Sequence, residues 1–215
     1  IIPIKIFGLN EFAVRFPSAL FGSLAVFLTF FFVIQLFPKK DDKEKKRIEY
    51  VGLISALLLA ISPWHLMLSR AAFEANISSF LIILGSLLFL LAVNGRKNYL
   101  FFSGIAFAAT FYTFNSSRVF VPIFVIGLVI FFYKKLWKIK KEVVLSGIMS
   151  LLFLLPLIPF LLSPQASTRF KEVNIFSDPE IVLDANAKIE ENGNSPIAKI
   201  IYNRRVGYAQ SYISH

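Results

Sequence analysis

The sequence predicts an all-α integral membrane protein, a polytopic helical bundle followed by an extramembrane segment. Of its 215 residues, 56% are hydrophobic and 17% are charged, the mean hydropathy is +0.67, and 25 residues are phenylalanine. The apolar residues form long uncharged runs without the alternation of a membrane barrel, and in lipid a helix satisfies its own backbone polar groups. Because the chain has no cysteine, a disulfide framework and a thiolate metal site are excluded.

About six transmembrane helices are expected in a membrane domain that covers residues 1–162. The predicted spans are residues 16–38, 50–69, 75–93, 99–117, 119–133 and 143–162. The fifth span is short for a hydrocarbon core that needs about 20 residues. Arg118, Lys134 and Lys135 at its ends extend it, because their long side chains reach out to the membrane surface.

The connecting loops differ in charge from one side of the predicted membrane to the other. Thirteen Lys and Arg residues fall in the loops at 39–47, 96–97 and 134–141. Apart from the C-terminal segment, the opposite side has only Lys5, Arg15, Arg70 and Arg118. The positive-inside rule therefore places the thirteen in the cytoplasm. Topology and anionic lipid account for the net charge of +10, so no nucleic-acid partner is expected.

Residues 163–215 are polar and are expected to form a loop on the outer, periplasmic side of the cell membrane. Turn signals occur at Asp178–Pro179 and in the run 192–196, and a helix is expected to begin at a Ser195 cap followed by Pro196. The chain starts without Met and stops inside this polar stretch. Both ends are interpreted as truncations, so the chain is expected to be an internal fragment.

Three arginines lie at the predicted outer edge of the membrane, within the runs 10–18, 62–76 and 111–118. Ionisable residues at membrane depth are costly and are functional candidates by default. An arginine presents a planar fork of donors that suits a phosphate. The three arginines, with carboxylate, amide and aromatic side chains between them, predict a site for a lipid-linked phosphate whose sugar projects outward.

Structural explanations compete with this interpretation at each arginine. Asn10 is placed to cap a helix in which Glu11 and Arg15 pair at i, i+4. Arg70 and Glu74 have the same spacing, and Arg118 is placed to snorkel. His65 is interpreted as a hydrogen-bonded residue at the membrane edge and not as a metal ligand, since the only other histidine is His215.

Three segments, in order along residues 1–165, resemble the GT-C glycosyltransferases of the dolichyl-phosphate-mannose protein mannosyltransferase type, in particular bacterial and archaeal members. The segments are FGLNEFAVRFPSALFGSLAV, ISPWHLMLSRAAFEAN and FYTFNSSRVFVPIF. The first is similar to the start of the family's second transmembrane helix. The resemblance implies transfer of a sugar from a polyprenyl-phosphate carrier to a protein, lipid or glycan acceptor on the outer face.

The resemblance also implies which residues bind the substrate. The family's catalytic carboxylate lies in the first outer loop, which would precede Ile1, so no catalytic residue is assigned and the fragment is expected to be inactive alone. No cofactor is assigned; the resemblance implies that this carboxylate either acts as the general base or positions the acceptor and a divalent metal ion. The arginines would neutralise the phosphate as it leaves, and Glu74 would orient Arg70 or bind a sugar hydroxyl. The positions that match the family's motifs are Arg15, Arg70, Glu74, Asn76, Tyr112 and Arg118.

Two other functions remain open at this point. One is a transporter or flippase for lipid-linked saccharides, a class in which charges often lie at the membrane midplane on broken helices. The charges here are predicted at one outer edge, which favours the enzyme. The other is a membrane-assembly subunit without chemistry, whose outer arginines would only snorkel.

Overall fold

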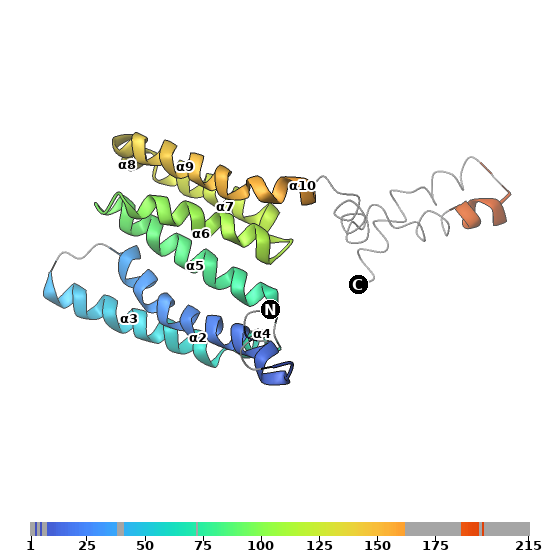
Figure 1. Cartoon of the computed structure of the whole chain (residues 1–215), viewed down its shortest axis with the longest axis horizontal. Coiled ribbons are helices and arrows are strands. Elements are labelled where there is room, and N and C mark those ends of the chain that lie inside the picture. The colour runs from blue at the N-terminus through green and yellow to red at the C-terminus, as the bar shows by residue number, and fades with distance from the viewer. Residues whose placement is uncertain are drawn as a thin grey trace. The chain divides into compact units, whose positions relative to one another are not determined.

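A computed structural model describes residues 3, 5, 8–37, 41–71, 73–161, 186–193 and 195. The described chain is helical and has no strand, which confirms the predicted all-α class (Figure 1). Two compact units are present, Ile1–Leu155 and Pro156–His215. The elements of the first unit, with a boundary turn, are α2 (Glu11–Leu36), α3 (Asp42–Ile61), α4 (Pro63–Arg70), α5 (Glu74–Val93), α6 (Tyr99–Thr113), α7 (Ser117–Phe131), α8 (Tyr133–Leu136), η1 (Trp137–Ile139), α9 (Lys140–Leu154) and η2 (Leu155–Leu157).

The long helices of the first unit lie side by side and run alternately in opposite directions (Figure 1). Helix α5 packs between α2 and α6, α9 packs on α6, and α3 packs on α2. The bundle therefore has two ends. We call the end with residues 41–47, 94–98 and 132–141 the lysine-rich end, and the end with residues 10–15, 62–76 and 113–118 the arginine end.

The second predicted span, residues 50–69, is a broken helix. Helix α3 begins within the charged loop at Asp42, where the Asp41 side chain accepts a hydrogen bond from the Glu44 N–H at 2.8 Å. It ends at Ile61, and α4 departs at 57°. The cause is Pro63, which lacks an N–H and holds Ser62 in an extended conformation (φ −61°, ψ 123°).

The number of spans stays a prediction. Helices α2 and α5 are each long and apolar enough to cross a membrane. The bent pairs α3–α4 and Ser117–Phe131 with Tyr133–Leu157, the latter bent by 76°, raise the number to four among the described residues if each pair is one span. Helices α6 and α9 have 15 residues each, fewer than the roughly 20 that a straight crossing needs.

Packing in the bundle is typical of a membrane protein. The interior contains alanines and serines beside larger apolar residues such as Phe89 and Phe107, while many other large apolar residues, such as Leu57 and Ile130, are exposed. Helices in lipid associate through small residues and interhelical hydrogen bonds, because lipid tails are as apolar as leucine. The buried polar residues are Ser18, Asn76, Ser78, Ser86, Ser103, Thr110, Ser117 and Ser146.

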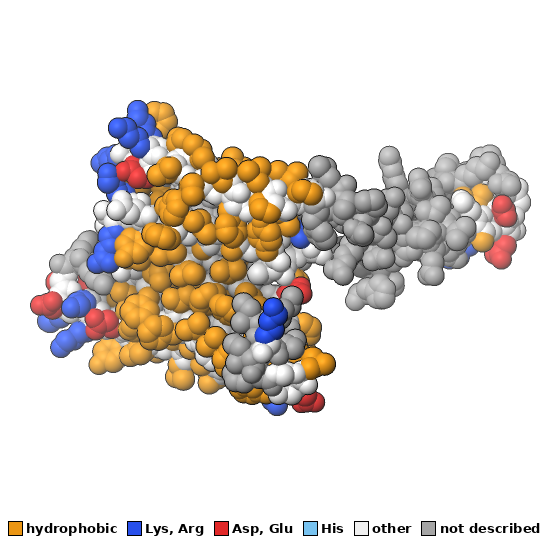
Figure 2. Space-filling view, viewed as in Figure 1, with side chains coloured by type: hydrophobic (Ala, Val, Ile, Leu, Met, Phe, Trp, Pro, Cys, Tyr) orange, Lys and Arg blue, Asp and Glu red, His pale blue; other side chains and the backbone are white. Residues whose placement is uncertain are grey.

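The two ends of the bundle carry the features of membrane interfaces. On the face shown in Figure 2, Lys and Arg side chains gather at the lysine-rich end and a band of hydrophobic side chains covers the middle. The two tryptophans are both exposed, Trp64 at the arginine end and Trp137 at the lysine-rich end. Tryptophan is enriched at both membrane surfaces. The chain is a membrane protein.

The second unit contains α10 (Ile158–Leu161) and a short helical stretch over residues 186–191. That stretch ends where Gly193 adopts a left-handed φ of 64°, the conformation that glycine provides at helix ends. The Gly193 N–H donates to the carbonyl of Glu190 at 3.0 Å. The helix predicted from Ser195 and Pro196 lies outside the described residues, as does most of the predicted loop.

Candidate functional site

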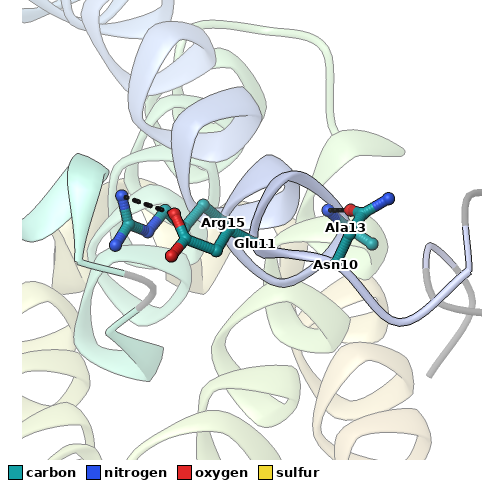
Figure 3. A network of polar contacts seen from close by, with 4 residues as sticks. All are labelled: Asn10, Glu11, Ala13 and Arg15. Atoms are coloured by element: carbon teal, nitrogen blue, oxygen red, sulfur yellow. Dashed lines mark hydrogen bonds and ion pairs between the residues drawn. The ribbon is translucent and has the colours of Figure 1, made fainter.

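The start of α2 places Arg15 at the arginine end. The Asn10 side chain accepts a hydrogen bond from the Ala13 N–H at 2.7 Å, and an Arg15 nitrogen lies 3.8 Å from a Glu11 oxygen (Figure 3). This confirms the predicted cap and the i, i+4 pair. The side chains of Arg15 and Glu11 are 60% and 86% exposed, and a pair so exposed is worth about 0–1 kcal/mol. The guanidinium therefore stays available to an anionic ligand.

An ion pair of Arg70 with Glu74, the structural explanation that competed with a substrate-binding role, is not formed. Helix α4 ends at Arg70 and α5 begins at Glu74, so no continuous helix places the two residues on one face. In the part of the chain that the structure describes, Glu74 forms no ion pair with Arg15 or with Arg70. Arg70 and Glu74 are both exposed.

Asn76 lies in a buried polar junction between three helices and is only 1% exposed. Its Nδ2 donates to the Ser18 carbonyl at 2.6 Å, and it lies 3.3 Å from the Ser18 Oγ and 3.4 Å from the Ser69 Oγ. Gly22 permits this approach, because a Cβ there would lie 3.0 Å from the Asn76 Nδ2 and closer to Ser69. We call Ser18, Gly22, Ser69 and Asn76 the polar junction of α2, α4 and α5.

Two further hydrogen bonds hold α4 on α2. The Ser18 Oγ donates to the Leu68 carbonyl at 3.0 Å, and the His65 Nε2 lies 3.1 Å from the Gly22 carbonyl. The prediction that His65 is hydrogen bonded is confirmed. These hydrogen bonds fix α4 on α2. They therefore also fix the backbone of Arg70, the last residue of α4, at the arginine end.

Tyr112 lies in the last turn of α6, and Arg118 lies in the first turn of α7. Helix α9 ends at the same end of the bundle. The Arg118 Nε donates to the Phe111 carbonyl at 3.1 Å, and the Tyr112 hydroxyl donates to the Phe153 carbonyl at 2.6 Å. The half-buried Arg118 is therefore joined to α6, and α6 to α9, at the arginine end.

The start of α7 is also fixed to α5. The buried Ser78 and Ser117 hydroxyls lie 2.5 Å apart. Ser18, Ser69, Ser78 and Ser117 were not predicted as site residues, and the sequence gives little signal for them, since serine is common in membrane helices for several reasons. The small-residue spacing of Ser18 and Gly22 is the one available hint.

A protein-family model, described as dolichyl-phosphate-mannose-protein mannosyltransferase, matches residues 2–162. The chain belongs to this family. The match covers the whole helical bundle and all six predicted substrate-binding residues, so the chain is a membrane glycosyltransferase of the mannosyltransferase type. No curated protein and no solved structure matches the chain significantly.

The arginine end of this mannosyltransferase-family chain offers positive charge to a ligand. Helices α2, α5 and α7 begin there and present backbone N–H groups that can bind an anion, while α4, α6 and α9 end there. Glu11 and Glu74 are the acidic side chains of the described segments at this end. Across the described residues, no group of three or more His, Cys, Asp or Glu side chains is placed to hold a metal ion.

Proposed function

We propose that this chain transfers a sugar from a polyprenyl-phosphate-linked donor, held at the arginine end, to an acceptor on the outer face of the membrane. The observation that carries the proposal is that Arg15, Arg70 and Arg118 all lie at one end of a mannosyltransferase-family bundle. The excess of Lys and Arg at the other end supports an orientation with the lysine-rich end in the cytoplasm. The bundle then crosses the membrane several times.

The chemistry makes one bond and breaks another at the anomeric carbon of the sugar. An acceptor atom attacks this carbon, the bond from the carbon to the phosphate oxygen breaks, and the electron pair leaves with the polyprenyl phosphate. The acceptor's proton passes to a base, which we do not assign. Negative charge grows on the phosphate in the transition state, so arginines beside it accelerate the reaction.

The six predicted substrate-binding residues fall into three groups according to the role that we propose for each. Arg15 and Arg70 are exposed and Arg118 is half-buried, and all three are proposed to bind the donor phosphate. The exposed carboxylate of Glu74 and the Tyr112 side chain are proposed to face the sugar. The amide of Asn76 is engaged inside the protein, so we propose that it positions Arg70 and does not touch the substrate.

Sugar transfer from radiolabelled polyprenyl-phosphate donors tests the proposal, using membranes that contain the full-length protein. We expect Arg70→Ala to lower kcat/KM roughly 100-fold, as expected when a charge-stabilising donor group is removed from a transition state. Arg96→Ala is the matched control, because Arg96 is also exposed but lies at the lysine-rich end. Arg96→Ala should transfer sugar at the wild-type rate.

Two results would overturn the proposal. Equal rates for Arg70→Ala and wild type would remove Arg70 from the donor site. Saturable movement of the lipid-linked sugar across the bilayer, with no transfer to any acceptor, would instead identify a transporter or flippase.

A further inference from the structure

The connection between α7 and α9 carries a one-sided charge. Residues 131–141, which include α8 and η1, contain five lysines and no acidic residue. All five lysines are exposed, and Figure 2 shows Lys and Arg side chains gathered at the end of the bundle where α8 lies. We call residues 131–141 the basic connection. Its lysines are Lys134, Lys135, Lys138, Lys140 and Lys141.

The start of α3 lies at the same end of the bundle but has a balanced charge. Residues 41–49 contain four basic and four acidic side chains. The positive-inside rule concerns the total of Lys and Arg on one side of the membrane, and it does not require that the charges gather in one segment. The basic connection therefore needs a reason of its own.

No carboxylate neutralises the basic connection among the residues that the structure describes. The nearest acidic residue along the chain is Glu142, and its Oε1 lies 2.7 Å from the Nζ of Lys97, which precedes α6. This ion pair joins the start of α6 to the start of α9 and uses the carboxylate. Within the described ranges, none of the five lysines forms an ion pair.

Helix stability does not explain the lysines at the start of α9. Lys140 and Lys141 occupy its first turn, where the partial positive charge of a helix start disfavours a further cation. Ile139, which precedes them, makes no side-chain hydrogen bond that caps the helix, and Glu142 in the same turn is paired with Lys97. Residues that break a local rule of stability are often found where a protein binds a ligand or a partner.

Apolar contacts hold the basic connection against the end of the bundle. Leu136 is only 6% exposed and belongs to an apolar cluster with Phe89 of α5 and Leu100 of α6. The ring of Phe132 packs against the same cluster. The lysines on either side of Leu136 are therefore presented from a backbone with a fixed place.

Exposed aromatic rings accompany the lysines. Phe131, Tyr133 and Trp137 are 79%, 58% and 78% exposed, and the Lys134 Nζ lies 5.9 Å from the centre of the Tyr133 ring. Lysines interleaved with exposed aromatic rings are typical of a segment at the membrane surface, where the rings reach the acyl boundary and the ammonium groups reach the lipid headgroups.

We propose that the basic connection binds the headgroups of anionic phospholipids at the membrane surface opposite the arginine end. Such a lipid offers a phosphate to the ammonium groups and acyl chains to the exposed rings, which are the two chemistries that residues 131–141 present. A cluster of about four to eight basic residues beside a membrane helix is the usual pattern for anionic lipid binding. The inference needs only that the chain is a membrane protein, and it does not depend on the proposed sugar transfer.

The experiment counts the lipids bound to the full-length protein in a neutral detergent by native mass spectrometry, while phosphatidylglycerol or phosphatidylcholine is added. The test variant combines Lys134→Gln, Lys135→Gln and Lys138→Gln, and the matched control combines Lys43→Gln, Lys45→Gln and Lys46→Gln. Both variants remove three exposed positive charges from the lysine-rich end, so both should fold. Only the test variant changes the basic connection.

We expect the wild type and the matched control to retain phosphatidylglycerol in preference to phosphatidylcholine. The test variant should bind phosphatidylglycerol roughly tenfold or more weakly, since each lysine near an anionic surface contributes a factor of about five. Arginine at the same three positions keeps the charge and should restore the binding.

Equal losses in the test variant and the matched control would overturn the inference, because the lipid would then respond to the charge of the whole end. A wild type without preference for phosphatidylglycerol would also overturn it, and would favour a protein with an acidic surface as the partner of these lysines. Sugar transfer is measured separately. Its absence would remove the proposed function and leave the lipid result unchanged.

Discussion

The polar junction of α2, α4 and α5 is closed, whereas an apolar cavity of about 410 Å³ lies between α6, α7 and α9. At the junction, Gly22 has no room for a Cβ, and Asn76 donates across the helices to Ser18. Gly147 lines the cavity and has open space, and serines that also line it donate to carbonyls within the bundle. A closed junction fixes a side chain, whereas an open one leaves a volume that a ligand can fill. We connect the polar junction with the position of Arg70.

The largest expected effect is a loss of folding in Gly22→Leu. The new side chain would overlap Ser69 and Asn76, and overpacking of a filled site costs about 3 kcal/mol. Unfolding in a denaturing detergent should show this loss. Gly127→Leu in α7 is the control, because a Cβ at Gly127 meets no atom within 4 Å. A Gly22→Leu protein as stable as the control would mean that α2 and α4 are not in close contact.

A smaller loss is expected for Asn76→Leu. This change removes the amide that joins α2, α4 and α5, and interhelical hydrogen bonds in membranes contribute about 0.6–1.7 kcal/mol. Ser79→Ala is the control, because the exposed Ser79 hydroxyl bonds only within its own helix, to the Ala75 carbonyl. The same unfolding measurement applies, and unchanged stability of Asn76→Leu would argue against the junction.

Tyr112→Phe tests the link between α6 and α9 at the arginine end. The variant keeps the aromatic contact with Phe153 and loses the hydrogen bond to its carbonyl. We expect a loss of about 0.6 kcal/mol. If Tyr112 also faces the sugar, as proposed, the same variant lowers the rate of sugar transfer by more than this stability change explains. Unchanged transfer would leave Tyr112 with only its structural contact.

The smallest effect is expected for Gly147→Ala, which sharpens the contrast with Gly22. A methyl group at Gly147 meets open space, and alanine favours a helix over glycine by about 0.8–1 kcal/mol. The variant should therefore be as stable as the wild type or slightly more so. A destabilised Gly147→Ala would show that the cavity is closed in the protein.

The sequence predicted the helices well where polar residues mark their ends. The expected span at 75–93 agrees with α5 at Glu74–Val93, and the Asn10 cap sets the start of α2. Helix α3 begins eight residues before the expected span at 50, because hydropathy marks the lipid boundary whereas the Asp41 cap marks the helix start. The break at Pro63 could also have been foreseen from the sequence.

The sequence predicted which residues of the site lie at the same end of the bundle. It did not predict the contacts between them. The Asn76 contact joins residues 58 apart in the chain, and no local pattern encodes such a pairing. The Arg70–Glu74 pairing was wrong because spacing was interpreted without the helix break between the two residues. The cavity depends on how α7 diverges from α6, which is a property of tertiary packing alone.

The central claim is that the donor binds at an outward-facing arginine end. Because the chain has no cysteine, single introduced cysteines test this claim most directly. Single cysteines are introduced at the exposed positions Ser116 and Asn98, at the arginine and lysine-rich ends. Intact cells are then treated with a membrane-impermeant maleimide, with and without added polyprenyl phosphate. The account predicts that Ser116→Cys is labelled and is protected by polyprenyl phosphate, whereas Asn98→Cys is labelled only after the cells are opened and is not protected. Labelling of Asn98→Cys in intact cells, or no protection of Ser116→Cys, would contradict a donor site at an outward-facing arginine end.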